Sequence, residues 1–172
     1  VDSIGIVLLI SFFIGAVICI QMKLNIQSPW MPRWVSGYTT REILILEFSS
    51  SIMCLILSGK VGSNIASELG TMRVTQQIDA LDIMGVNSAS YLIMPKILGL
   101  VTIMPFLVIF SSVTGILGAY ATAYIGHILS PEDLTLGLQH AFNPWFVWMS
   151  IIKSLFFAFI IASVSSYYGY TV

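Results

Sequence analysis

Four long apolar runs alternate with short polar stretches along the chain. The runs cover residues 4–22, 43–58, 96–125 and 146–168. A helix needs about 20 mainly apolar residues to cross the hydrocarbon core of a bilayer, and small residues after position 58 extend the second run. The pattern therefore predicts an all-α membrane protein, a polytopic helical bundle with about four transmembrane helices.

The central segment, residues 60–95, is the only long stretch too polar for a bilayer. Apolar residues recur in it at i, i+4, i+7 and i+10, which predicts one amphipathic helix near Thr71 to Met84. Gly85 and the apolar Val86 after it predict a left-handed glycine at the end of that helix. The apolar stripe is Val74, Ile78, Leu81 and Met84, and the opposite side carries Thr75, Gln76, Asp79 and Asp82.

Turn and cap signals predict how the other elements begin. Asn87 or Ser88 can cap a short turn before Pro95, whose ring suits the first turn of the third span. Ser130 followed by Pro131 and two acids predicts a short helix that starts at the proline.

Loop 23–42 holds helix breakers and aromatic residues typical of a membrane surface, and a second aromatic belt opens the fourth span: Trp145, Phe146 and Trp148.

Small and charged residues mark candidate sites inside the spans. Glu47 stands in the first turns of the second span and Lys153 about two turns inside the fourth, where a charge is costly unless it meets water or a partner. Each is either functional or a snorkelling interfacial charge. Gly115 and Gly118 permit close helix contact in the third span, and a second small-residue set follows the second span: Gly59, Gly62, Ala66 and Gly70.

Composition supports a membrane protein independently of the pattern. Hydrophobic residues make up 57% of the chain and charged residues 9%, against about 25% charged in soluble domains. The net charge of −1 comes without a basic run, which argues against nucleic acid as a partner. Cys19 and Cys54 lie in apolar runs, and His127 and His140 lack partners at metal-ligand spacing, so we expect no metal site.

The chain lacks the motifs of a nucleotide-binding or hydrolytic enzyme. Ser58-Gly59-Lys60 is followed by Val61, so it does not form a phosphate-binding loop. A nucleophile elbow and an H-E-x-x-H motif are also absent from the sequence. We expect no enzyme and no cofactor in this chain.

About twenty positions of the central segment and its borders agree in order with one family, without a gap. They lie in residues 59–63, 66–81 and 84–86 and in the pair Pro95-Lys96. On these residues the chain resembles the MlaE-type permeases, membrane subunits of ATP-driven lipid transporters. The family's usual chain is longer at both ends, so the resemblance implies a fragment without an N-terminal interfacial helix and a last span.

The resemblance implies a function, partners and a location. It implies a permease subunit that moves phospholipid or a related lipid between the bacterial inner membrane and a periplasmic carrier, for outer-membrane lipid homeostasis. Its partners would be a second copy of itself, ABC ATPase subunits that bind ATP and Mg, a lipid-binding MCE-type protein and membrane lipids. The positive-inside rule is undecided here, and the resemblance places the central segment in the cytoplasm.

This orientation gives the candidate residues their expected roles. Glu47 and Lys153 are expected to line the lipid pathway near the periplasmic face. Glu68 is expected to accept hydrogen bonds from the start of the next helix or from a partner subunit, because Arg73 at i+5 would not pair with it. The candidates for coupling to the ATPase are Glu68, Thr71, Arg73, Gln77, Asp79 and Asp82.

Two other classes stay open. In one, the chain is a non-transporting membrane scaffold or anchor whose central segment is only interfacial. In the other, it is an intramembrane enzyme that uses Glu47 and Lys153 for proton transfer. Co-purification of an ATPase separates the first from a permease, and ATP-independent lipid turnover would favour the second.

Overall fold

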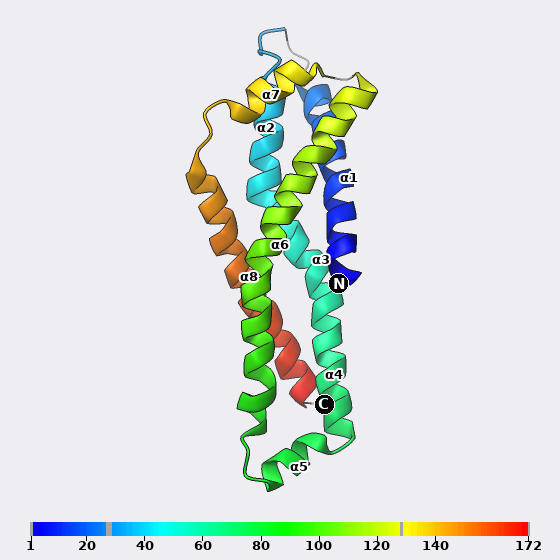
Figure 1. Cartoon of the computed structure of the whole chain (residues 1–172), viewed down its shortest axis with the longest axis vertical. Coiled ribbons are helices and arrows are strands. Elements are labelled where there is room, and N and C mark those ends of the chain that lie inside the picture. Colours follow the sequence, from blue (N-terminus) through cyan, green and yellow to red (C-terminus); the bar gives the residue numbers. More distant parts are fainter. Residues whose placement is uncertain (1, 27–28, 128, 172) are drawn as a thin grey trace. The chain divides into compact units, whose positions relative to one another are not determined.

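The fold is a computed structural model that describes residues 2–26, 29–127 and 129–171 (Figure 1). These residues form helices and connecting turns, with no strand among them. Four helices are long and apolar enough to cross a membrane: Ile4–Asn25, Val35–Val74, Ser88–Ile125 and Pro144–Thr171. The prediction of an all-α, polytopic membrane protein is confirmed.

The second of these helices is built from five consecutive elements. α2, η1, α3, η2 and α4 follow one another without a break, and the two η elements are π-helical. The full order is α1 (Asp2–Asn25), α2 (Val35–Ile43), η1 (Leu44–Ile52), α3 (Met53–Leu57), η2 (Ser58–Gly62), α4 (Ser63–Val74), α5 (Gln77–Ile83), α6 (Ser88–Gly126), α7 (Pro131–Gln139) and α8 (Pro144–Thr171).

The second and third long helices begin earlier than the sequence predicts. The second begins at Val35 rather than residue 43, because α7 covers its first turns and supports helix there. α6 begins at Ser88, so the placement of Pro95 in a first turn is wrong. Asn87 caps α6 instead: its Oδ1 accepts from the Ser90 N–H at 3.3 Å and its carbonyl from the Tyr91 N–H at 3.1 Å.

The chain divides into two compact units. The first combines Val1–Met53 with Leu107–Ile152, and the second combines Cys54–Phe106 with Lys153–Val172. Glu47 therefore belongs to the first unit, whereas Lys153 and the central segment belong to the second.

In the first unit, glycines bring α1 and α6 into backbone contact. A Cβ on Gly15 would lie 1.9 Å from the Gly115 carbonyl oxygen, and one on Gly118 would lie 2.0 Å from that of Phe12. Helix backbones approach this closely only where side chains are missing. The predicted close contact at Gly115 and Gly118 is confirmed.

α7 packs on α2 in the same way. A Cβ on Gly137 would lie 2.3 Å from the Trp34 carbonyl oxygen and 2.8 Å from the Cα of Gly37. α7 also begins as predicted, with Pro131 as its first residue and the Ser130 hydroxyl accepting from the Asp133 N–H at 3.3 Å. α7 is therefore fixed at its first residue by the cap and at Gly137 by the contact with α2.

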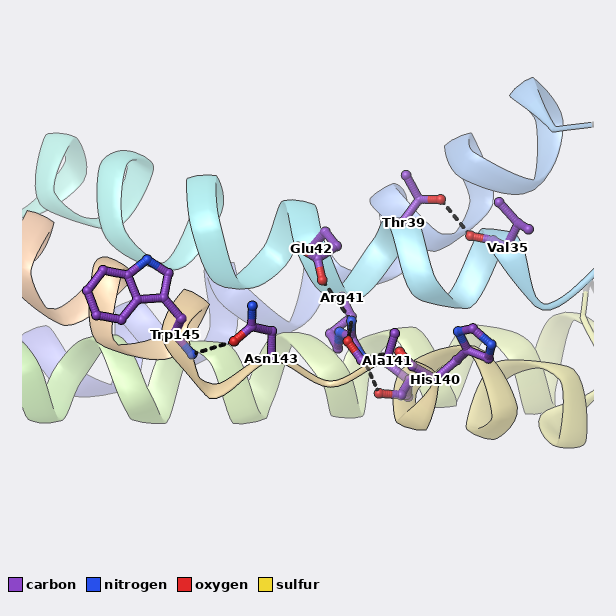
Figure 2. Close-up of polar contacts among 9 residues, drawn as sticks. Val35, Thr39, Arg41, Glu42, His140, Ala141, Asn143 and Trp145 are labelled. Atoms are coloured by element: carbon purple, nitrogen blue, oxygen red, sulfur yellow. Dashed lines mark hydrogen bonds and ion pairs between the residues drawn. The ribbon is translucent and has the colours of Figure 1, made fainter.

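A buried arginine fixes the end of α7 (Figure 2). The Arg41 guanidinium, only 3% exposed, donates to the carbonyl oxygens of Leu138 at 2.7 Å and His140 at 2.9 Å. It also pairs with Glu42 at 2.7 Å. Carbonyls at a helix end need such donors, because the helix itself leaves them unpaired. The His140 side chain is exposed, and its ring stacks on that of Trp34 with the centroids 4.1 Å apart.

Candidate functional site

The candidate site is the central segment, where α5 joins α4 to α6 (Figure 1). The prediction of one helix from Thr71 to Met84 is wrong, because α4 ends at Val74 and α5 starts at Gln77. Gln76 adopts a left-handed conformation with φ 61° between them, and its N–H donates to the Arg73 carbonyl at 3.0 Å. The chain turns a corner at this residue.

The corner separates the two ends of the predicted apolar stripe. In one straight helix, Val74 and Ile78 would share a face, four residues apart. Here Val74 is 74% exposed whereas Ile78 is completely buried. The turn therefore lets Ile78 anchor α5 to the second unit without burying Val74.

An ion pair spans the corner. The Arg73 guanidinium lies 2.8 Å from the Asp79 carboxylate, with both side chains partly exposed. An exposed pair of this kind contributes about 0–1 kcal/mol, so it favours the angle of the corner without enforcing it. Asp79 thus has a partner inside the chain that the single-helix prediction could not reveal.

The C-terminal end of α5 closes as the sequence predicts. Gly85 is left-handed with φ 79°, and its N–H donates to the Asp82 carbonyl at 3.0 Å. The Val86 N–H donates to the Leu81 carbonyl at 3.2 Å. These two bonds form a Schellman motif, so the predicted glycine terminator is confirmed. The Asp82 side chain reaches onward to the Ser88 N–H at 3.4 Å.

Glu68 links the two helices that flank α5. Its carboxylate forms an ion pair with the Lys96 ammonium of α6 at 2.5 Å. Among the described residues, this donor lies in α6 and not at the start of α5, and the expected hydrogen bond from a partner subunit stays a prediction. Sequence reasoning missed Lys96 because 28 residues separate the partners and only the turn between α4 and α6 brings them together.

The small residues of the second unit differ in what they contact. A Cβ on Gly169 of α8 would lie 2.8 Å from the Cα and carbonyl oxygen of Ala66, and one on Gly62 would lie 2.8 Å from the Ser165 hydroxyl. A Cβ on Gly70 would be 3.9 Å from Gly169, and one on Gly59 would meet nothing within 4 Å. Ala66 and Gly62 therefore form the close contact between α4, η2 and α8.

The remaining coupling candidates lie on the surface. The Thr71 hydroxyl donates to the Glu68 carbonyl at 2.8 Å, and Gln77 is the exposed first residue of α5. Ile83 is 86% exposed and Met84 next to it is also exposed. The outer face of α5 thus combines acids and amides with large apolar side chains.

Comparison with known proteins identifies the chain. The family model described as Permease MlaE matches residues 1–172. The chain belongs to the MlaE permease family. It is 33% identical over 173 residues to a probable ABC transporter permease protein of Rickettsia bellii, covering 98% of this chain and 64% of that protein.

Chloroplast and cyanobacterial proteins also match this MlaE-family chain. Protein TRIGALACTOSYLDIACYLGLYCEROL 1, chloroplastic, of Arabidopsis thaliana is 30% identical over 173 residues, covering 98% of this chain and 48% of that protein. A probable ABC transporter permease protein of Synechocystis is 28% identical over 170 residues, with 64% of it covered. The chain thus spans 64% or less of the length of these relatives.

The two charged residues predicted for a lipid pathway lie in different units of the MlaE-family chain. Glu47 is exposed in η1, about three turns after Val35 rather than one turn into its helix. Lys153 is half-buried in α8, about two and a half turns after Pro144. Their shared role in a pathway stays a prediction.

A small recess in the first unit is lined by polar and apolar side chains. Ser11, Ser49 and Ser111 bring three buried hydroxyls to it, and Ser11 and Ser111 share a hydrogen bond of 2.8 Å. Its volume of about 10 Å³ is near the space one water occupies. This recess is too small for a lipid.

Proposed function

We propose that this chain is the membrane permease subunit of an ABC lipid transporter. The observation that carries the proposal is α5, a short helix that connects two long apolar helices and has an exposed outer face. The relatives' names as ABC transporter permeases support the same role. ATP and Mg would be bound by a separate ATPase subunit.

The outer face of α5 has the composition of a docking surface for that ATPase. Ile83 and Met84 supply exposed apolar contacts, and Asp82 and Gln77 supply polar groups beside them. Specific interfaces commonly combine an apolar centre with a polar rim. Movement of the ATPase would then reach the long helices through α4 and α6.

A lipid is the proposed substrate, as phospholipid or a related molecule. The plant relative carries the name of a lipid, trigalactosyldiacylglycerol. Glu47 and Lys153 would present charge to a headgroup, since a polar group crossing an apolar path is stabilised by such contacts. The chain would work with a second copy of itself and an MCE-type periplasmic carrier, in the bacterial inner membrane, for outer-membrane lipid homeostasis.

Reconstitution tests the proposal. The full-length protein would be purified with its ATPase and placed in vesicles of phosphatidylethanolamine and phosphatidylglycerol that carry a fluorescent phospholipid. We expect the labelled lipid to move only when ATP is hydrolysed. Stable assembly without ATP-dependent lipid movement, or purification without any ATPase, would instead support a scaffold or anchor.

A further inference from the structure

The side chain of Tyr170, near the end of α8, contacts both flanks of α5. Its hydroxyl lies 2.9 Å from the Ser88 hydroxyl, at the first residue of α6. Its ring lies below the Arg73 guanidinium, whose carbon is 5.9 Å from the ring centroid, in the last turn of α4. One residue of α8 therefore touches the chain just before and just after α5.

α5 depends on such outside contacts for its orientation. It has seven residues, and Ile78 is the only one of them that is buried. Isolated helices this short are marginal in water, so packing and flanking contacts must fix them. The contacts of Tyr170 act on those flanks.

Tyr170 is itself held in place by its neighbour. Gly169 packs so closely on α4 that a Cβ there would lie 2.8 Å from the Ala66 carbonyl oxygen and 3.0 Å from the Leu69 Cβ. This backbone contact fixes the last turn of α8 on α4. The backbone of Tyr170, which carries the ring, is therefore held in a defined position.

The two hydroxyls of the Tyr170 contact differ in their access to water. Ser88 is only 2% exposed, whereas Tyr170 is half-buried. A buried hydroxyl that loses its partner costs more than a half-exposed one, which can turn to water. Removing one hydroxyl is thus not equivalent to removing the other.

We propose that Tyr170 is a positioning residue that sets the angle of α5 and links it to the end of α8. Because Tyr170 holds both flanks, a movement of the end of α8 is transmitted to α5 as a whole. The inference rests on the proposed function, in which α5 binds the ATPase. It implies that the contacts of Tyr170 determine how efficiently ATP hydrolysis is coupled to lipid movement.

The test compares four variants of the full-length protein with its ATPase, in the fluorescent-lipid vesicles described above. They are Tyr170→Phe, Ser88→Ala, the double variant, and the control Tyr168→Phe on the exposed side of the same helix. The first readout is the number of ATP molecules hydrolysed per lipid moved. We expect Tyr170→Phe to raise it about three- to tenfold, the effect of one lost hydrogen bond with a buried partner.

The pattern among the variants distinguishes positioning from general damage. Ser88→Ala should have a smaller effect than Tyr170→Phe, because the remaining phenol can be hydrated. The double variant should resemble Ser88→Ala, since no buried hydroxyl is left unpaired. Tyr168→Phe should match the wild type. A wild-type ratio in Tyr170→Phe, or effects that simply add in the double variant, would overturn the proposal.

A second readout does not need transport. Amide hydrogen exchange over residues 77–84 should be about three- to tenfold faster in Tyr170→Phe than in Tyr168→Phe. Equal exchange in the two would overturn the positioning role. Failure of the wild-type complex to move lipid with ATP would overturn the proposed function instead, while exchange still decides whether Tyr170 holds α5.

Discussion

Arg41 donates from its guanidinium to the Leu138 carbonyl at 2.7 Å and so connects the second long helix to the end of α7. The same group donates to the His140 carbonyl at 2.9 Å and lies 4.9 Å from the centre of the Tyr38 ring. A planar guanidinium presents five donors in a rigid fork and a face that stacks on a ring, whereas a lysine ammonium presents three donors from a single point. This part of the first unit therefore depends on an arginine specifically.

Arg41→Lys should destabilise the protein by about 1–3 kcal/mol, because at least one part-buried carbonyl at the end of α7 loses its donor. The measurement is chemical denaturation of the full-length protein in micelles. Arg33→Lys is the matched control, since Arg33 is exposed eight residues earlier. Equal stability of the two variants would show that a charge alone is sufficient at position 41.

Gly169→Ala should weaken the packing of α8 on α4, because its Cβ would overlap the Ala66 backbone. We expect a loss of about 1–3 kcal/mol in stability, typical of overpacking. Gly59→Ala is the control, since a Cβ there meets no atom of the described chain within 4 Å. It should be neutral or stabilising by up to about 1 kcal/mol. Loss of self-association in Gly59→Ala alone would show that the helix packing predicted for Gly59 is made with a second copy of the chain.

Asp79→Lys, which reverses the charge at this position, should uncouple ATP hydrolysis from lipid movement. The introduced ammonium would repel the Arg73 guanidinium and open the corner. The paired exchange Arg73→Asp with Asp79→Arg tests the origin of this effect. Restored coupling would assign Asp79 to the ion pair within the chain. Coupling that stays lost would assign it to the ATPase, where its original sign is needed. Asp82→Lys, measured in the same assay, should release the ATPase if Asp82 faces it.

Glu68→Gln should keep most of the activity and Glu68→Ala should not, because glutamine still accepts from the Lys96 ammonium. A double-mutant cycle of Glu68→Ala and Lys96→Ala should give a coupling energy of about 0.2–1 kcal/mol, as for other partly exposed ion pairs. Full activity in both Glu68 variants would show that Glu68 is only a solvated acid at a helix end.

Glu47 and Lys153 can be tested as a pair by exchanging their charges. Single substitutions to alanine should reduce lipid transport at unchanged ATPase assembly if both line the pathway. The double exchange Glu47→Lys with Lys153→Glu should restore a structural latch but not a headgroup site, which needs each charge in its own place. Wild-type transport and folding in both alanine variants would identify snorkelling charges.

Local signals in the sequence predicted the elements that depend on neighbouring residues only. The start of α7 at Pro131 and the glycine terminator at Gly85 are set by caps that act over a few positions. The four apolar helices follow from length and composition. These features need no knowledge of the rest of the fold.

Features set by distant contacts could not be predicted. The turn at Gln76 lacks a glycine signal and is revealed by the different exposure of Val74 and Ile78. The partners of Glu68 and Arg41 lie 28 and 97 positions away, respectively. The start of the second long helix at Val35 likewise depends on packing against α7, so Glu47 lies farther from its helix start than predicted.

The ion pair between Glu68 and Lys96 has a consequence for the order of assembly during synthesis. Both partners lie on the helices next to α5, so they can meet as soon as the start of α6 has been made. Tyr170 is added only with the last turn of α8. The ion pair between α4 and α6 can therefore form before Tyr170 has been synthesised. A chain arrested before α8 would contain this ion pair, but its α5 would lack the contacts of Tyr170.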